Sequence, residues 1–156
     1  MSNYWDILRS TTDCVQFAYA ADVDEEFLPL PAEMRANGVV HAYVDYLEVR
    51  RSGAHICNVI AKALRLENAP YEAVPGPRGI HIWIPFLDDL GGLSYQVEGA
   101  AIIIDNADVL LAEDSKTMFK LIEAFLAPLH HWLDQKKPFH LCFQMEKSDL
   151  VRRIFG

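Results

Sequence analysis

A run of small and apolar residues ends abruptly in acidic and amide side chains between residues 99 and 111, where the chain reads GAAIIIDNADVLL. This pattern is typical of a central strand in a parallel sheet, because helices cover both faces of such a strand. Asp105, Asn106 and Asp108 are then expected just past the carboxyl end of the strand, where open α/β sheets usually bind their ligands. An acidic strand end of this kind is also a feature of nucleotide hydrolases.

The other segments alternate between strand and helix patterns. We expect strands at 39–44, 100–104 and 139–145, helices at 52–67, 85–90 and 115–134, and a tail or last helical turn at 146–156. Residues up to Ile84 should approach the short helix in extended form, Gly91-Gly92 should end it, and Pro128 should kink or split the long helix. Alternating strands and helices imply an α/β fold with a three-stranded parallel sheet.

The N-terminal part of the chain differs from the rest in its charge. Residues 1–48 contain nine acidic and two basic residues, whereas residues 49–156 contain thirteen and twelve, and the formal net charge is −8. The segment 14–19 fits a strand or a helical turn, and Pro29 and Pro31 prevent a helix from continuing beyond it. We therefore expect two parts, an acidic extension at 1–36 packed on the core and a main domain at 37–156.

Charge and cysteine usage exclude several classes of protein. The acidic front lacks the basic footprint of a nucleic-acid binder and suits a basic protein partner. The three cysteines lie far apart without a C-x-x-C pair, which disfavours disulfides and zinc and fits a reducing compartment. The first residues do not form a signal peptide, and no apolar run approaches the ~20 residues of a membrane span. We expect a cytoplasmic protein that binds neither nucleic acid nor membrane.

Nucleotide hydrolysis requires a phosphate-binding loop as well as an acidic strand end. Such a loop is rich in glycine, ends in Lys-Ser or Lys-Thr, and lies between an earlier strand and its helix. The stretch 44–53 offers only Gly53 and no such lysine, and Lys116-Thr117 follows the acidic strand without a preceding glycine. The sequence therefore disfavours ATP or GTP hydrolysis and predicts no cofactor.

Other catalytic or metal-binding patterns are equally weak. His130 and His131 are adjacent, so their side chains should diverge by about 100° on a helix and share no metal. The other candidate ligands and nucleophiles stand without a motif: His55, His81, His140, Ser94, Ser115 and Cys142. A catalytic triad assembled in space from distant residues stays an open alternative. We expect no metal site and no catalytic residue.

Aromatic and acidic side chains gather in the loop and short helix between the first two expected strands. Rings bury contact area at low entropic cost and acids attract basic partners, so the cluster suits a protein interface. The alternative is that Trp83 belongs to the core and the acids form a solvated face. The predicted partner contacts are Tyr71, Glu72, His81, Trp83, Asp88 and Asp89, with Asp24, Glu25 and Glu26 as steering charges.

Several local sequences, taken in their order, point to a known family. They are Tyr43-Val44-Asp45, Val49-Arg50-Arg51-Ser52, Ile60-Ala61-Lys62-Ala63-Leu64, Leu87-Asp88-Asp89-Leu90, 101–111, Trp132 and Pro138-Phe139. Over about residues 38–145 the chain resembles the barstar family of ribonuclease inhibitors and toxin immunity proteins. The resemblance implies a three-stranded parallel sheet with packed helices. It also implies an inhibitor that plugs a basic active site with its second helix and the preceding loop.

The region corresponding to that inhibitory helix departs from the family pattern. Residues 71–79 replace a loop rich in Tyr, Gly and Asn, and only Tyr71 carries over. Counting back from Asp89 places His81, Ile84 and Pro85 where the family has an acid, an aromatic and another acid. We expect an immunity-type inhibitor without catalysis that binds a cognate toxin, with a ribonuclease as one candidate, one to one and occludes its active site. The alternatives are a small enzyme using Asp105 and Asp108, and a non-catalytic protein-binding adaptor.

Overall fold

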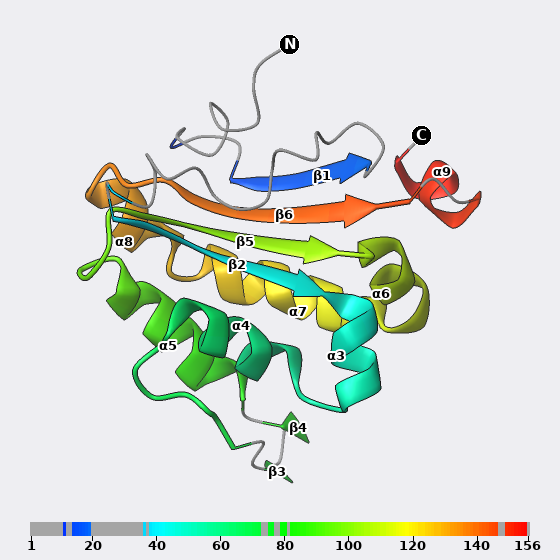
Figure 1. Cartoon of the computed structure of the whole chain (residues 1–156), viewed down its shortest axis with the longest axis horizontal. Coiled ribbons are helices and arrows are strands. Elements are labelled where there is room, and N and C mark those ends of the chain that lie inside the picture. Colours follow the sequence, from blue (N-terminus) through cyan, green and yellow to red (C-terminus); the bar gives the residue numbers. More distant parts are fainter. Residues whose placement is uncertain are drawn as a thin grey trace.

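A four-stranded parallel sheet forms the centre of the molecule. In this computed structural model the described residues are 11, 14–19, 36, 38–72, 75–76, 79–80, 82–146 and 149–155. The strands lie in the order β1 (Val15–Tyr19), β6 (Phe139–Met145), β5 (Gly99–Asp105) and β2 (Val39–Asp45), and every pair is parallel (Figure 1). The α/β class and the parallel sheet predicted from the sequence are therefore confirmed.

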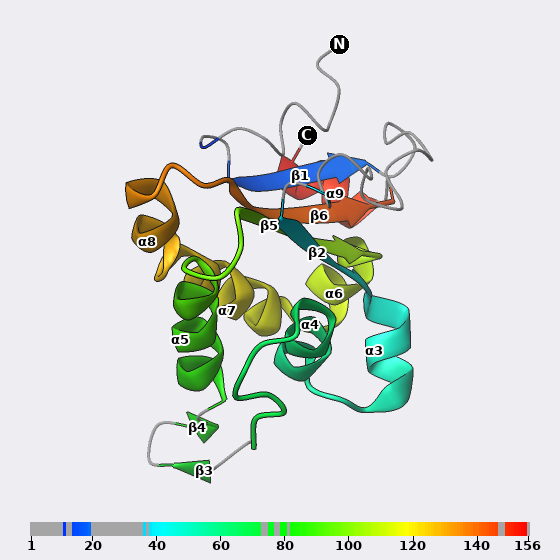
Figure 2. The same ribbon diagram turned by 60° about the vertical axis from the view of Figure 1, so that its left-hand side comes forward.

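The helices of the two crossovers lie on one face of this sheet. Between β2 and β5 come α3 (Tyr46–Ser52), α4 (Ile56–Leu64), the short hairpin strands β3 (Pro75–Gly76) and β4 (Gly79–Ile80), and α5 (Trp83–Leu93). Between β5 and β6 come α6 (Ala107–Glu113), α7 (Ser115–Leu126) and α8 (Leu129–Asp134), and α9 (Asp149–Phe155) follows β6. Both crossovers step in the same direction along the sheet, so right-handed connections place their helices on the same face, as Figures 1 and 2 show.

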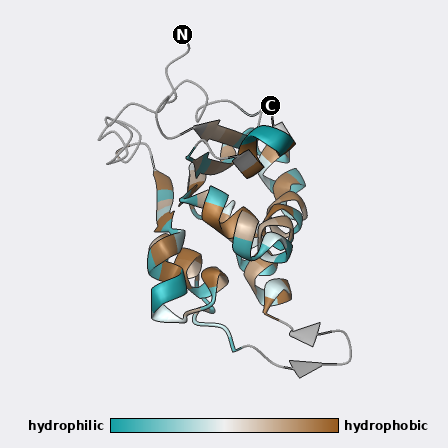
Figure 3. Ribbon diagram, turned by 90° about the vertical axis from the view of Figure 1, so that its right-hand side faces the viewer, coloured by the Kyte–Doolittle hydropathy of each residue, from teal (hydrophilic) through white to brown (hydrophobic). Residues whose placement is uncertain are grey.

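Burial explains why the two central strands are mostly apolar, and His140 and Gln144 of β6 are polar residues buried among them. All residues of β6 and all of β5 except Asp105 are buried. β2 lies at the edge of the sheet, and there Ala42 and Val44 are buried while Tyr43 is exposed. In Figure 3 the helices carry hydrophobic and hydrophilic stretches side by side, as expected of amphipathic helices that turn one face to a sheet.

Aromatic side chains fill the core between the sheet and the helices at the start of β6. Trp132 is fully buried and stacks on Phe139 with ring centroids 4.4 Å apart, and Phe125 packs on the same ring at 4.2 Å. The indole Nε1 of Trp132 donates a 3.2 Å hydrogen bond to the carbonyl of Leu90. This bond joins α8 to α5 and helps to position α5.

The number of strands is a correction to the sequence analysis, which expected three. The fourth strand, β1, pairs with the edge of β6 from Val15↔Leu141 to Tyr19↔Met145, and the amide of Leu141 donates a 2.8 Å hydrogen bond to the carbonyl of Cys14. Without β1 the wholly buried β6 would present an unpaired edge. These residues lie within the predicted extension 1–36. The boundary between that extension and the domain at 37–156 stays a prediction.

The second correction concerns α5, which was expected only at 85–90 after an extended approach through Ile84. The helix begins at Trp83, because Pro85 occupies its first turn, where a missing backbone N–H costs no intrahelical hydrogen bond. It also continues through Gly91-Gly92 to Leu93. Gly91 packs against α8 so closely that a Cβ there would lie 3.3 Å from the ring of His131.

The expected helices lie near their predicted positions with shifted ends, whereas α6 was not predicted. The predicted helix 52–67 is α4, which begins at Ile56 after the cap residue His55, and Ser52 instead ends the unpredicted α3. The predicted split at Pro128 is confirmed, because α7 ends at Leu126 and α8 begins at Leu129. Within the described residues every helix is too short or too polar to traverse a lipid bilayer.

Candidate functional site

Two of the predicted partner contacts are bonded to each other. Tyr71 is buried, with 7% of its surface exposed, and its hydroxyl donates a 2.6 Å hydrogen bond to Oδ2 of Asp89 on α5. Asp89 also accepts hydrogen bonds from the backbone N–H and the side-chain amide of Asn68, at 3.1 and 2.7 Å. Burial first, and then the Asp89 carboxylate, raise the pKa of the Tyr71 phenol above its usual range. Both side chains therefore fasten the loop before α5 to that helix.

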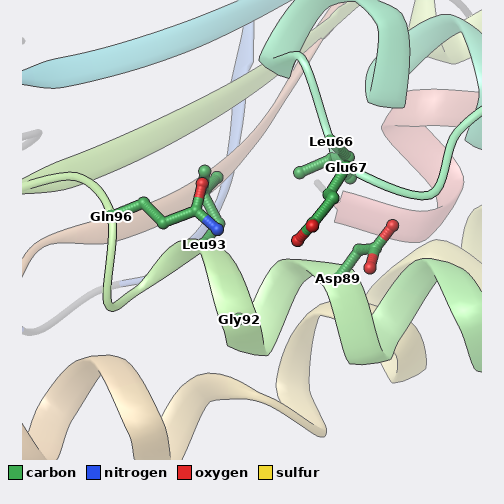
Figure 4. Close-up of a pocket in the computed structure, with 6 residues that line it drawn as sticks. All are labelled: Leu66, Glu67, Asp89, Gly92, Leu93 and Gln96. Atoms are coloured by element: carbon green, nitrogen blue, oxygen red, sulfur yellow. The ribbon is translucent and has the colours of Figure 1, made fainter.

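A small hollow lies beside this contact. It has a volume of about 30 Å³ and is bounded by Leu66, Glu67, Asp89, Gly92, Leu93 and Gln96. In Figure 4 the side chain of Glu67 extends from the turn after α4 toward α5 and lies between Gln96 and Asp89. A space of this size holds no ligand much larger than a water molecule.

The remaining predicted contacts have different positions. Trp83 is half-buried, and its ring makes edge contacts with His55 at 5.3 Å and with Phe86 at 6.2 Å. Glu72 and Asp88 are exposed. His81, Asp24, Glu25 and Glu26 lie outside the described residues. Tyr71 is thus bonded to Asp89, Tyr71 and Trp83 both contact the ring of Phe86, and Asp88 is exposed.

A groove runs between α5 and the junction of α7 with α8, on the side that carries Asp88. Its volume is about 300 Å³, and Asp88, Gly91, Gly92, Tyr95, His130 and His131 are among the residues that line it. Tyr95 is 70% exposed, and its hydroxyl lies 3.5 Å from Nδ1 of His131. Tyr95 was not predicted as a site residue. The sequence offers only a weak indication of it, an aromatic residue shortly after the glycine pair Gly91-Gly92.

The adjacent histidines lie closer together than the sequence predicted. Their ring centroids are 4.0 Å apart and the rings are tilted by 37°, because rotation about the side-chain bonds brings both rings over one turn of α8. His130 Nδ1 lies 3.1 Å from the carbonyl of Ala127. Among the described residues, no group of three His, Cys, Asp or Glu side chains has the arrangement of a metal site.

The acids that follow the apolar run of β5, Asp105 and Asp108, lie at the carboxyl edge of the sheet. Asp105 accepts a hydrogen bond from the hydroxyl of Tyr43 and one from the backbone N–H of Asn106 at 2.9 Å. The side-chain amide of Asn106 donates to Oδ1 of Asp45 at 2.8 Å, across to the neighbouring strand. Burial, followed by the Asp105 carboxylate, raises the pKa of Tyr43 above its usual range. These hydrogen bonds link Tyr43, Asp105, Asn106 and Asp45 in a chain across the edge of the sheet.

Asp108 has a separate role at the same edge. Its carboxylate accepts a 3.1 Å hydrogen bond from the backbone N–H of Glu146, just after β6. It therefore ties the first turn of α6 to the end of β6, apart from the network around Asp105. Asn106, between the two acids, has a φ of 55°, a left-handed conformation that asparagine tolerates better than most residues.

Comparison with known proteins gives a similarity of fold. A chain in the solved structure "Structure of Drosophila ORC bound to DNA" matches with a TM-score of 0.50 and 11% sequence identity, over 92% of this chain and 34% of that chain. This chain therefore spans about a third of the length of that relative. At such low identity the similarity concerns the fold alone. No family model and no curated protein matches the chain.

Proposed function

We propose that this chain is a non-catalytic binding protein of the immunity-inhibitor type, which holds a basic protein partner against the exposed side of α5. The observation that carries the proposal is the groove between α5 and the α7–α8 junction, which is lined by the carboxylate of Asp88 and the exposed ring of Tyr95. The barstar-like fold, the toxin as partner and the occlusion of its active site belong to this proposal.

The exposed side of α5 has the composition of an interface. Ile84 is 57% exposed and Tyr95, just after the helix, is 70% exposed, while Asp88 lies between them and is also exposed. The opposite side of the same helix is anchored in the core by Phe86 and Leu90. Large exposed side chains on a rigid, well-packed helix suit protein recognition, because little conformational entropy is lost on binding.

The groove favours a basic side chain of the partner. A lysine or arginine that enters it would meet the carboxylate of Asp88 and the ring of Tyr95, which supply an ion pair and a cation–π contact. Gly92 leaves space there, because a Cβ at this position would meet no atom within 4 Å. The overall charge of −8 adds long-range attraction for the same kind of partner.

The acids at the carboxyl edge of the sheet already accept hydrogen bonds within the protein, which favours binding over catalysis. Asp105 and Asp108 each accept hydrogen bonds that hold neighbouring parts of the fold together, which gives both carboxylates a structural role. The relative in the fold comparison is bound to DNA, but the acidic charge of this chain argues against the same ligand here. The enzyme alternative predicts that Asp105→Asn with Asp108→Asn abolishes activity, whereas an inhibitor would keep its neutralising effect.

Co-expression with the product of the adjacent reading frame tests the proposal. That product should slow growth when expressed alone, and this chain should restore growth and copurify with it. Asp88→Asn and Tyr95→Ala should each weaken the complex at least tenfold. Glu146→Gln and Phe119→Ala, which remove an exposed carboxylate and an exposed ring elsewhere, serve as matched controls. If the product is not toxic and no complex forms, the proposal is contradicted. A complex that is insensitive to both α5 variants would place the interface elsewhere than in this groove.

A further inference from the structure

A second, larger groove lies along α4 and shares no lining residue with the groove beside α5. After Leu64 the chain turns at Arg65, which has a φ of 56°, and runs back along the helix. Two hydrogen bonds hold the returning segment. The backbone N–H of Tyr71 donates to Oδ1 of Asn58 at 2.6 Å, and Nδ2 of Asn58 donates to the carbonyl of Tyr71 at 2.9 Å. The groove between helix and segment has a volume of about 680 Å³.

The lining of this groove is apolar except at its rim. Its apolar residues are Ala54, Val59, Ala61, Leu66, Ala69 and Pro70. The amide of Asn58 is occupied by Tyr71, so it does not need a ligand. A groove of this size with a predominantly apolar lining and few polar groups has the usual character of a small-molecule site.

Both charged residues of the groove are cations. Lys62 and Arg65 line it and are exposed, and neither forms an ion pair with a carboxylate among the described residues. The nearest acid in the sequence, Glu67, is instead directed toward α5, as Figure 4 shows. In a chain with a net charge of −8, this groove therefore combines an apolar floor with a locally positive rim.

We infer that this groove binds an anionic amphiphile, a molecule with an apolar body and a carboxylate or phosphate head. The apolar body lies on Val59 and Leu66, where it is removed from water. The head contacts Lys62 and Arg65, with which no carboxylate of the described residues pairs. This site is independent of the protein partner proposed above, and its test does not depend on that partner.

Binding of four matched twelve-carbon ligands to the full chain tests the inference. Dodecanoate and dodecyl phosphate carry the two candidate heads, while dodecyl maltoside is neutral and dodecyltrimethylammonium is a cation. Titration calorimetry below the critical micelle concentrations should give one saturable site for at least one anion. The neutral and cationic ligands should bind at least tenfold more weakly. The stronger of the two anions identifies the head.

Variants at the rim complete the test. Lys62→Gln combined with Arg65→Asn should weaken anion binding at least tenfold, and asparagine is chosen because it tolerates the left-handed backbone at position 65. Lys116→Gln combined with Arg152→Gln removes the same charge from exposed positions on α7 and α9 and should leave binding unchanged. Lys62→Gln alone, a substitution at an exposed helical position, provides the same test if the double variant unfolds. Absence of anion binding, equal binding of the neutral ligand, or indifference to the rim variants would each overturn the inference.

Discussion

The hydroxyl of Tyr71 donates a 2.6 Å hydrogen bond to Asp89, eighteen positions later in the chain, and so locks the loop before α5 onto that helix. Asp89 accepts two further hydrogen bonds from Asn68, so a single carboxylate fixes three donors. The proposed interface on the exposed side of α5 depends on this hydrogen bond indirectly, because the bond holds the preceding loop against that helix.

Removal of this lock should destabilise the fold. We expect Tyr71→Phe to lower the free energy of unfolding by about 1–2 kcal/mol and Asp89→Ala by about 2–3 kcal/mol, because the latter leaves several donors without an acceptor. Urea unfolding measures both changes, and a double-mutant cycle gives the coupling between the two residues. Asp88→Ala, at the exposed neighbouring position, should stay within about 0.5 kcal/mol of the native chain. Equal effects of the substitutions at 88 and 89 would refute the structural role of Asp89.

The residue types in this region were predictable from the sequence, but their roles were not. A tyrosine and an acid near a helix suggest an interface, and nothing local indicates that they are bonded to each other. The pairing depends on the turn after α4, which brings Tyr71 back beside α5. The role of Asn106 was equally unpredictable from local sequence, because its hydrogen bond to Asp45 joins residues 61 positions apart.

The fold was predictable from the sequence where the hydrophobic pattern was long and unambiguous. The continuous apolar run of β5 and the break at Pro128 are strong local signals. The strand β1 was not predictable in the same way, because five residues reading VQFAY fit a strand or a helical turn. Its pairing with the edge of β6 decides between them, and its partners there come 126 positions later in the chain, as from Val15 to Leu141.

Loss of β1 should expose the edge of β6. A chain that begins at residue 20 is expected to keep most of its far-UV circular dichroism but to associate with itself, because the backbone groups of β6 then lack partners. Size-exclusion chromatography with light scattering detects the association. A chain that begins at residue 14 keeps β1 and should behave like the full chain. If the shorter chain elutes like the longer one at every concentration, β1 does not protect this edge.

Lowering the pH should destabilise the fold through protonation of His55. The ring accepts a 3.1 Å hydrogen bond from the backbone N–H of Cys57 at the start of α4, and burial lowers the pKa of His55, partly offset by Asp114. Because the unfolded chain binds the proton more readily, stability should fall as the pH decreases below about 6.5. His55→Asn keeps a capping side chain without this titration. Unfolding at a series of pH values should therefore show a shallower acid slope for the variant, and identical slopes would exclude His55 as the cause.

The two adjacent glycines of α5 should respond to alanine in opposite directions. At Gly92 a Cβ would meet no atom within 4 Å, whereas at Gly91 it would lie 3.3 Å from Cδ2 of His131 and 3.5 Å from Cβ of Pro128. Alanine is favoured over glycine inside helices by up to about 1 kcal/mol, so Gly92→Ala should raise the melting temperature. Gly91→Ala should lower it, because α8 must move away from α5 and the bond from Trp132 to Leu90 lengthens. Thermal unfolding of the pair measures the difference. Equal stabilisation by both would mean that α5 and α8 are not in close contact at Gly91.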